Sequence, residues 1–132
     1  MNNLVDTHTF LWIVLASKAL SKSARAVLVD SESINYVSVV TFWEISLKFS
    51  LGKLNLKGIL PESLPTWASD TGFEILNLGP KVASSFYKLP ILDHKDPFDR
   101  LLVWQAISSR YVLVSKDKEL KDYEKHGLSL IW

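Results

Sequence analysis

The chain has 132 residues, of which 48% are hydrophobic and 22% charged, with a formal net charge of +1 and no cysteine. A chain of this length buries roughly 65–70% of its unfolded surface, so residues 1–132 are expected to form a single domain. The lack of cysteine excludes disulfides, thiolate metal sites and a cysteine nucleophile, and it fits a reducing compartment.

The longest apolar run covers residues 10–16, far fewer than the about 20 residues that a spanning helix needs. No signal-peptide pattern is visible, so we expect a cytoplasmic protein without a membrane span. A net charge of +1 argues against strong non-specific attraction to nucleic acid, but it leaves room for a local basic rim. Candidates for that rim are Lys48, Lys53, Lys57, Arg100, Lys116 and Lys118.

Short β-rich runs alternate with longer helical patterns along the whole chain. Turn, cap and breaker residues mark the ends of these segments. The expected strands are residues 4–5, 34–39, 73–76, 111–114 and 128–131, and the expected helices are residues 9–16, 21–31, 41–51 (ended by Gly52), 61–70, 80–87 and 97–109, with a short helix after Asp117.

The expected strands are continuous apolar runs rather than alternating ones, which is typical of strands with helices over both faces. Alternation of strand and helix predicts right-handed crossovers and a parallel sheet. The fold class expected from the sequence is therefore α/β, with three α/β/α layers around a central parallel sheet of about five strands.

Four acidic residues each lie where an apolar segment gives way to a helix start: Asp6, Glu44, Asp99 and Asp117. In open parallel sheets, ligands bind at the carboxyl ends of the strands. If the strands at residues 4–5, 34–39 and 111–114 are neighbours, the four carboxylates face one crevice. Carboxylates that close together repel unless they are protonated or bind a cation, and oxygen donors favour Mg²⁺ or Mn²⁺.

Helix capping is a competing explanation for each acid. Thr41 and Glu44 have the spacing of a capping box, in which Glu44 would bond the Thr41 amide. Asp96 precedes Pro97 and fits a helix cap, with Asp99 near the positive end of the helix dipole. Asp6 and Asp117 could cap the helices that follow them.

The sequence resembles the PIN-domain ribonucleases over essentially its whole length, and most closely the VapC-type toxins of toxin–antitoxin pairs. Four ordered segments carry the resemblance, and the third is the most specific. They are LVDTH at residues 4–8, FWEI at 42–45, HKDPFDRLL at 94–102 and VSKD at 114–117.

The resemblance implies a Mg²⁺- or Mn²⁺-dependent endoribonuclease that acts on RNA, forms a homodimer and is inhibited by a cognate antitoxin protein. Asp6, Glu44, Asp99 and Asp117 would be its catalytic and metal-binding residues. Ser115 stands where the family commonly has Thr and keeps the hydroxyl, so Ser115 and Asp96 are expected to support the site. His8, Lys48, Arg100 and Lys116 are candidate RNA contacts, whereas His94 and His126 show no pattern.

Other classes compete with this interpretation. A dehalogenase-type phosphatase needs a second Asp at the position of His8, and a receiver domain needs an Asp at the position of Asn77. A non-catalytic interaction module, in which the acids only cap helices, stays open. Its support is an excess of apolar aromatic residues, part of which would form a dimer or antitoxin interface: Trp12, Phe42, Trp43, Phe49, Phe86 and Tyr87.

Overall fold

The computed structural model describes residues 1–16 and 18–132 and has a parallel five-stranded sheet at its centre, in the order β3-β2-β1-β4-β5. Every pair of neighbouring strands runs in parallel. The strands are β1 (Asn2–Val5), β2 (Ile34–Ser38), β3 (Glu74–Leu76), β4 (Val112–Val114) and β5 (Ser129–Ile131). The predicted parallel sheet is therefore confirmed, and β2, β1 and β4 are neighbours.

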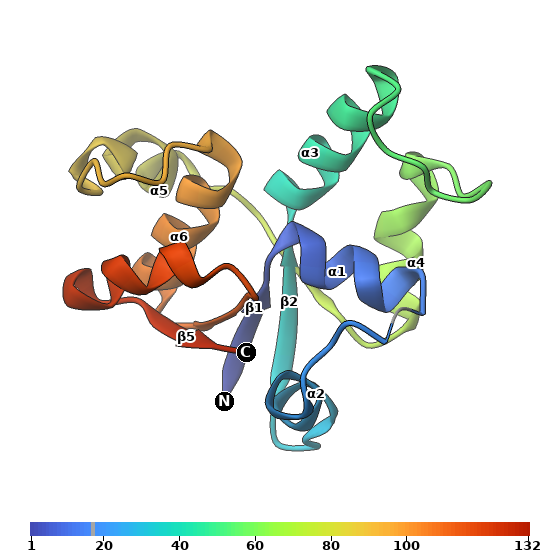
Figure 1. Cartoon of the computed structure of the whole chain (residues 1–132), viewed down its shortest axis with the longest axis horizontal. Helices are drawn as coiled ribbons and strands as arrows, with labels where there is room; N and C mark the ends of the chain where they lie inside the picture. The colour runs from blue at the N-terminus through green and yellow to red at the C-terminus, as the bar shows by residue number, and fades with distance from the viewer. Residues whose placement is uncertain (17) are drawn as a thin grey trace.

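Helices connect the strands and cover the sheet (Figure 1). In Figure 1, α1, α2 and α4 lie on one side of the strands, and α5 and α6 lie on the other. The α-helices are α1 (Thr7–Val14), α2 (Lys22–Val29), α3 (Val39–Ser50), α4 (Leu64–Asp70), α5 (Pro80–Ser85) and α6 (Pro97–Ser109), and the 3₁₀ helices are η1 (Pro61–Ser63), η2 (Phe86–Lys88) and η3 (Lys118–His126).

Two separate hydrophobic cores lie on the two faces of the sheet. Because successive strand residues point to opposite faces, Leu4 of β1 belongs to one core and its neighbour Val5 to the other. The same alternation separates Leu113 from Val114 in β4. Both faces of the central strands are thus buried, which explains their continuous apolar sequence and confirms the three-layer α/β/α arrangement.

The beginning of α3 differs from the prediction. The sequence favoured a strand through Val39 and a helix from Thr41, because Val39 and Val40 are β-branched. In the structure, the Ser38 hydroxyl accepts a hydrogen bond from the Val40 amide and caps the helix, which begins at Val39. The cap outweighs the local strand preference of the two valines. Gly52 follows α3 with a φ of +69°, as expected of a residue that ends a helix.

The aromatic residues divide between core and surface. Phe42 and Phe86 pack against the two cores, whereas Trp43, Phe49 and Tyr87 are exposed. Across residues 1–16 and 18–132, the model contains no helix with the length and apolar character that crossing a membrane requires.

Candidate metal centre and active site

The candidate site lies at the carboxyl ends of the three neighbouring strands β2, β1 and β4. Asp6 directly follows β1, α3 with Glu44 directly follows β2, and Asp117 lies three residues past β4. Asp99 is brought to the same edge by the first turn of α6. The sheet order thus meets the condition under which the sequence predicted a shared crevice.

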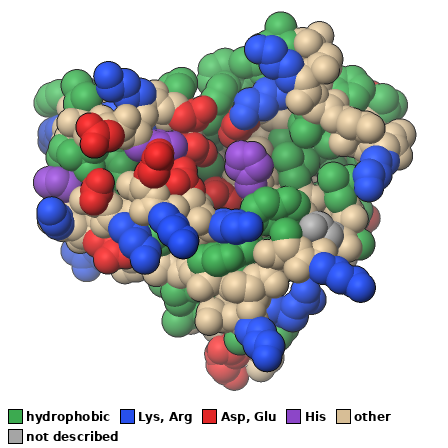
Figure 2. Space-filling model, viewed as in Figure 1, with side chains coloured by type: hydrophobic (Ala, Val, Ile, Leu, Met, Phe, Trp, Pro, Cys, Tyr) green, Lys and Arg blue, Asp and Glu red, His purple; other side chains and the backbone are tan. Residues whose placement is uncertain are grey.

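Three of the four acids border one open cavity of about 330 Å³. Asp6, Asp99 and Asp117 line it together with His8, Trp12 and Lys116. Figure 2 shows Asp and Glu side chains gathered around the hollow in the middle of this face, with His side chains beside them. Glu44 borders an adjoining hollow instead, and His8 lines both. The structure therefore brings three predicted residues into one cavity and places the fourth beside it.

Asp6 is held at the base of the cavity by hydrogen bonds to both carboxylate oxygens, and its residue is only 5% exposed. Oδ1 accepts from the Thr9 amide at 2.9 Å and so caps α1, while Oδ2 accepts from the Ser115 hydroxyl. Burial raises the pKa of Asp6, although these hydrogen bonds oppose the rise. Ser115 also accepts from the Asp117 amide at 3.1 Å, so it ties the first acid to the loop after β4.

Glu44 is not a capping residue, which corrects the capping-box interpretation. Because α3 begins at Val39, Thr41 lies inside the helix and Glu44 lies in its second turn. The Glu44 carboxylate is 2% exposed, and it accepts from the Thr7 hydroxyl at 2.7 Å and from Lys48. Burial lowers the pKa of Lys48, but the hydrogen bond and charge of Glu44 outweigh this and leave the pKa raised.

The Asp99 carboxylate is repelled by the charges of three neighbouring acids. Asp96 caps α6 by accepting from the Asp99 amide at 3.0 Å, as predicted, so the Asp99 carboxylate itself is not used as the cap. Burial, with added repulsion from Asp96, Glu44 and Asp6, raises the pKa of Asp99 to about 6, against the opposing hydrogen bond from His94. A divalent cation would relieve the repulsion on a half-buried carboxylate that is surrounded by like charges.

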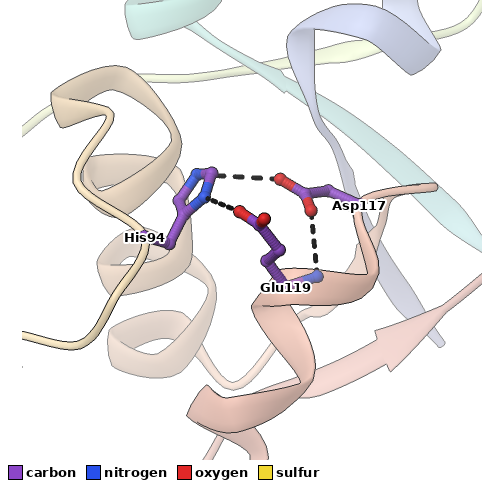
Figure 3. A group of neighbouring side chains, drawn as sticks. All are labelled: His94, Asp117 and Glu119. Carbon is purple, nitrogen blue, oxygen red and sulfur yellow. Dashed lines mark hydrogen bonds and ion pairs between the residues drawn. The ribbon is translucent and has the colours of Figure 1, made fainter.

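The role of His94 was missed in the sequence. Figure 3 shows the His94 side chain beside Asp117 and Glu119, and Asp99 is its third acidic neighbour. Its Nε2 lies 3.0 Å from Asp99 Oδ2 and 3.6 Å from Asp117 Oδ2, and its Nδ1 lies 2.9 Å from Glu119 Oε2. Burial lowers the pKa of His94, but its hydrogen bonds to Glu119 and Asp99 and the nearby charges outweigh this and raise it. His94 precedes α6 in a loop, where no periodicity in the sequence shows which way a side chain points.

The donor set fits a divalent cation. Atoms of His94, Asp117 and Glu119 lie within 4.8 Å of one another, close to the acids that line the cavity. Asp117 also caps η3 by accepting from the Glu119 amide at 2.9 Å, so capping and a place at the site coexist in this residue. Carboxylate oxygens suit Mg²⁺ and Mn²⁺, and an imidazole nitrogen is compatible with the latter.

The four predicted RNA contacts lie in different surroundings. His8 and Lys116 are exposed and line the cavity, whereas Lys48 is paired with Glu44. Arg100 points elsewhere: it donates to the carbonyls of Leu89 and Pro90 and to the Tyr123 hydroxyl, and it lies over the Phe86 ring. Those contacts occupy the guanidinium in packing, so the geometry does not support the expectation that Arg100 contacts RNA.

These features are those of a metal-binding α/β fold with acids at the carboxyl edge of its sheet, and the chain belongs to the PIN domain family, whose model matches residues 4–126. It is similar to a curated relative, "Ribonuclease VapC22" of Mycobacterium tuberculosis (strain ATCC 25618 / H37Rv). The two are 23% identical over 133 residues, which cover 98% of this chain and 97% of the relative.

Solved structures share the fold. VapBC2 from Rickettsia felis bound to a promoter DNA fragment has a TM-score of 0.69 at 18% identity, with 99% of this chain and 98% of that chain covered. VapBC-5 from Mycobacterium tuberculosis has a TM-score of 0.62 at 17% identity, with 98% and 97% covered. The PIN domain endonuclease Utp24 has a TM-score of 0.52 at 18% identity, with 98% and 82% covered.

Proposed function

We propose that this chain is a divalent-metal-dependent endoribonuclease, the toxin of a toxin–antitoxin pair, and that residues 1–132 are its single domain. The observation that carries the proposal is the convergence of Asp6, Asp99 and Asp117 on one open cavity at the carboxyl edge of the sheet. Family membership and the ribonuclease relative support the same activity. A cytoplasmic location, where RNA is present, belongs to the same proposal.

Asp6, Glu44, Asp99 and Asp117 would hold the ion, either directly or through water. A bound Mg²⁺ or Mn²⁺ polarises a phosphoryl oxygen and lowers the pKa of bound water. Ser115 keeps Asp6 in one orientation through its hydroxyl, and Asp96 fixes the first turn of α6, on which Asp99 lies. A carboxylate oxygen that does not hold the ion can accept a proton from the attacking water.

Glu44 separates this function from a non-catalytic module whose acids only cap helices. A buried carboxylate that bonds a threonine hydroxyl and a lysine, and no helix amide, does nothing for the helix start. Its charge instead acts on Asp99 across the site and contributes to the raised pKa of that residue. The helix-cap explanation therefore does not account for Glu44.

RNA cleavage with Mg²⁺ or Mn²⁺, with and without a chelator, tests the proposal, with Glu44→Gln as the diagnostic variant. Gln retains the acceptor for Thr7 and loses the charge, so we expect a melting temperature close to the parent's. We expect cleavage to fall by at least about 100-fold, more than is usual for residues outside the ligand set. Glu62→Gln, at an exposed position in η1, is the matched control.

Two results would contradict the proposal. One is a parent protein whose RNA cleavage is insensitive to the chelator, and the other is a folded Glu44→Gln variant that cleaves RNA as fast as the parent. The partner is tested separately: the product of a small reading frame beside this gene should copurify with the chain and inhibit cleavage. Vap-type toxin–antitoxin complexes among the similar structures support this expectation. The homodimer stays a prediction.

A further inference from the structure

A second, larger hollow adjoins the acid-lined cavity. Its volume is about 700 Å³, and it shares Lys116 and Asp117 with the first. Lys118 and Lys121 add two further positive charges to its lining, while Glu124 adds a negative one. A phosphate chain that approaches the acidic cavity meets repulsion there, so attraction has to come from the surroundings. The second hollow, called the lysine-lined hollow for Lys116, Lys118 and Lys121, supplies this attraction, although the whole chain carries a net charge of only +1.

Two tryptophans stand between the hollows. Trp12 lines the acid-lined cavity, Trp132 lines the lysine-lined one, and their ring centroids are 5.6 Å apart. His8 lies one helical turn before Trp12, with ring centroids 6.0 Å apart, and Lys116 Nζ lies 5.8 Å from the centre of the Trp12 ring. Aromatic rings and a cation thus form one continuous surface from the acids to the lysines.

Core packing accounts in part for Trp132 but not for Trp12. Ile13, Val14 and Trp132 pack against one hydrophobic core, whereas the partly exposed Trp12 belongs to neither core and lines the cavity. A tryptophan that borders a polar cavity offers a π-face to a ligand. Aromatic surfaces beside a positively charged groove are the arrangement with which proteins bind single-stranded nucleic acids.

We propose that Trp12, extended by Trp132, is the stacking surface for one unpaired base of the RNA next to the cleaved bond, and that Lys118 and Lys121 contact the phosphates that follow it. This inference rests on the ribonuclease function proposed above and adds a direction to it: the RNA runs from the acid-lined cavity across the tryptophans into the lysine-lined hollow. A base within a duplex is covered by its neighbours, so the surface selects unpaired RNA.

The test combines a protein change with a substrate change. The substrate is a mixed-sequence single-stranded RNA oligomer with a mapped cleavage site, made again with one abasic ribose at each position in turn. For the parent, we expect one abasic position beside the cleaved bond to lower kcat/KM by about 5- to 150-fold, the range typical of the stacking of one base on an aromatic ring. Trp12→Ala should lower kcat/KM for the complete oligomer by a similar factor. In this variant, the abasic substitution should cause no further decrease in kcat/KM.

Conservative variants separate stacking from structural damage. Trp12→Phe keeps a π-face and should keep sensitivity to the abasic position, whereas Trp12→Leu keeps apolar bulk and should lose it. Tyr87→Ala removes an aromatic side chain that is 80% exposed and lines neither hollow, and it should behave as the parent. Melting temperatures of all variants check the fold, and the Phe and Leu variants carry the test if Trp12→Ala does not fold.

A binding measurement keeps this inference distinct from the proposed activity. In chelator, fluorescence anisotropy should show that the parent binds the base-containing oligomer more tightly than a fully abasic oligomer of equal length, and that Trp12→Leu shows no such preference. Absence of chelator-sensitive cleavage by the parent would refute the ribonuclease function. Two results would refute the stacking surface. One is a Trp12→Ala variant in which every abasic position lowers kcat/KM by the same factor as in the parent. The other is a Trp12→Leu variant that still binds the base-containing oligomer more tightly than the abasic one.

Discussion

The imidazole of His94 lies 3.0 Å from the carboxylate of Asp99, although the sequence between them contains a helix cap and a proline. The loop before α6 thus turns back over the first turn of that helix. As a result, Asp99, whose pKa is raised by burial and by three neighbouring acids, has an imidazole partner only five residues earlier in the chain.

The metal-free protein should be more stable at pH 5.5 than at pH 7.5. Asp99 has a pKa raised from 3.8 to about 6, and the pKa of Asp6 is also raised, so each ionises in the folded protein at a cost that grows as the pH rises. The pKa of His94 is raised above 6.5, so the stabilisation by its charge is fully present below pH 6.5 and is lost as the pH rises through the higher pKa of the folded protein. All three effects have the same sign, and those of Asp99 and His94 fall in this interval. Melting curves in chelator, at constant ionic strength, measure the difference.

Saturating Mg²⁺ should reverse that pH trend, because the ion requires ionised carboxylates and protons compete with it. If the melting temperature of the metal-free protein decreases when the pH is lowered from 7.5 to 5.5, the effects assigned to Asp99, Asp6 and His94 are contradicted.

Asp99→Asn should be neutral or slightly stabilising without metal, because it removes one negative charge from the group formed with Asp96, Glu44 and Asp6. It should also reduce the rise in melting temperature on addition of Mg²⁺ or Mn²⁺. For the parent, metal at 100 times its Kd would add about 2.7 kcal/mol to the free energy of unfolding. Asp70→Asn, at an exposed acid outside this group, is the control. An unchanged response to metal in Asp99→Asn would argue against Asp99 as a ligand.

Ser115→Ala should destabilise the protein by about 1.5–3 kcal/mol, the usual cost of losing a hydrogen bond to a charged group. The Asp6 carboxylate, which is almost fully buried, would lose the hydroxyl that donates to its Oδ2. Ser115→Thr keeps that hydroxyl and should recover most of the stability and the response to metal. Urea unfolding of the three proteins gives the comparison. Equal losses in the Ala and Thr variants would mean that volume, not the hydroxyl, matters at this position.

Removing Lys118 and Lys121 together should weaken RNA binding and flatten its dependence on salt. Each phosphate contact on single-stranded nucleic acid contributes roughly 0.7 to the slope of log K against log salt, so the double alanine variant should lose about 1.4. Anisotropy titrations at several NaCl concentrations measure the slope. Lys81 and Lys88 are exposed and line neither the acid-lined cavity nor the lysine-lined hollow, so their double alanine variant serves as the control. Equal slopes in both double variants would refute the assignment.

Arg100→Ala should act on stability rather than on RNA affinity. Its guanidinium joins the carbonyls of Leu89 and Pro90 to the hydroxyl of Tyr123, so its loss leaves several acceptors without a donor. We expect a loss of about 1–3 kcal/mol in the free energy of unfolding. The salt dependence of RNA binding, measured as for the lysines, should not change. A reduced slope with unchanged stability would restore Arg100 as an RNA contact.

Much of the fold is encoded in local patterns. Continuous apolar strands, the cap at Asp96 and the glycine after α3 depend on neighbours a few residues away, and all three agree with the structure. The exception is also local: Val39 and Val40 favour a strand, and the cap from Ser38 outweighs them. That competition involves a few kcal/mol or less, which composition alone does not resolve.

The order of acids at the strand ends, and with it a candidate site at the sheet edge, could be read from the sequence by itself. Only the tertiary structure decided that Glu44 bonds Thr7, that His94 turns onto Asp99, that Arg100 is occupied in packing, and that Trp12 meets Trp132. The reason is physical. Propensity and capping act over one or two turns, whereas these contacts depend on the sheet order and on loops whose directions no periodicity encodes.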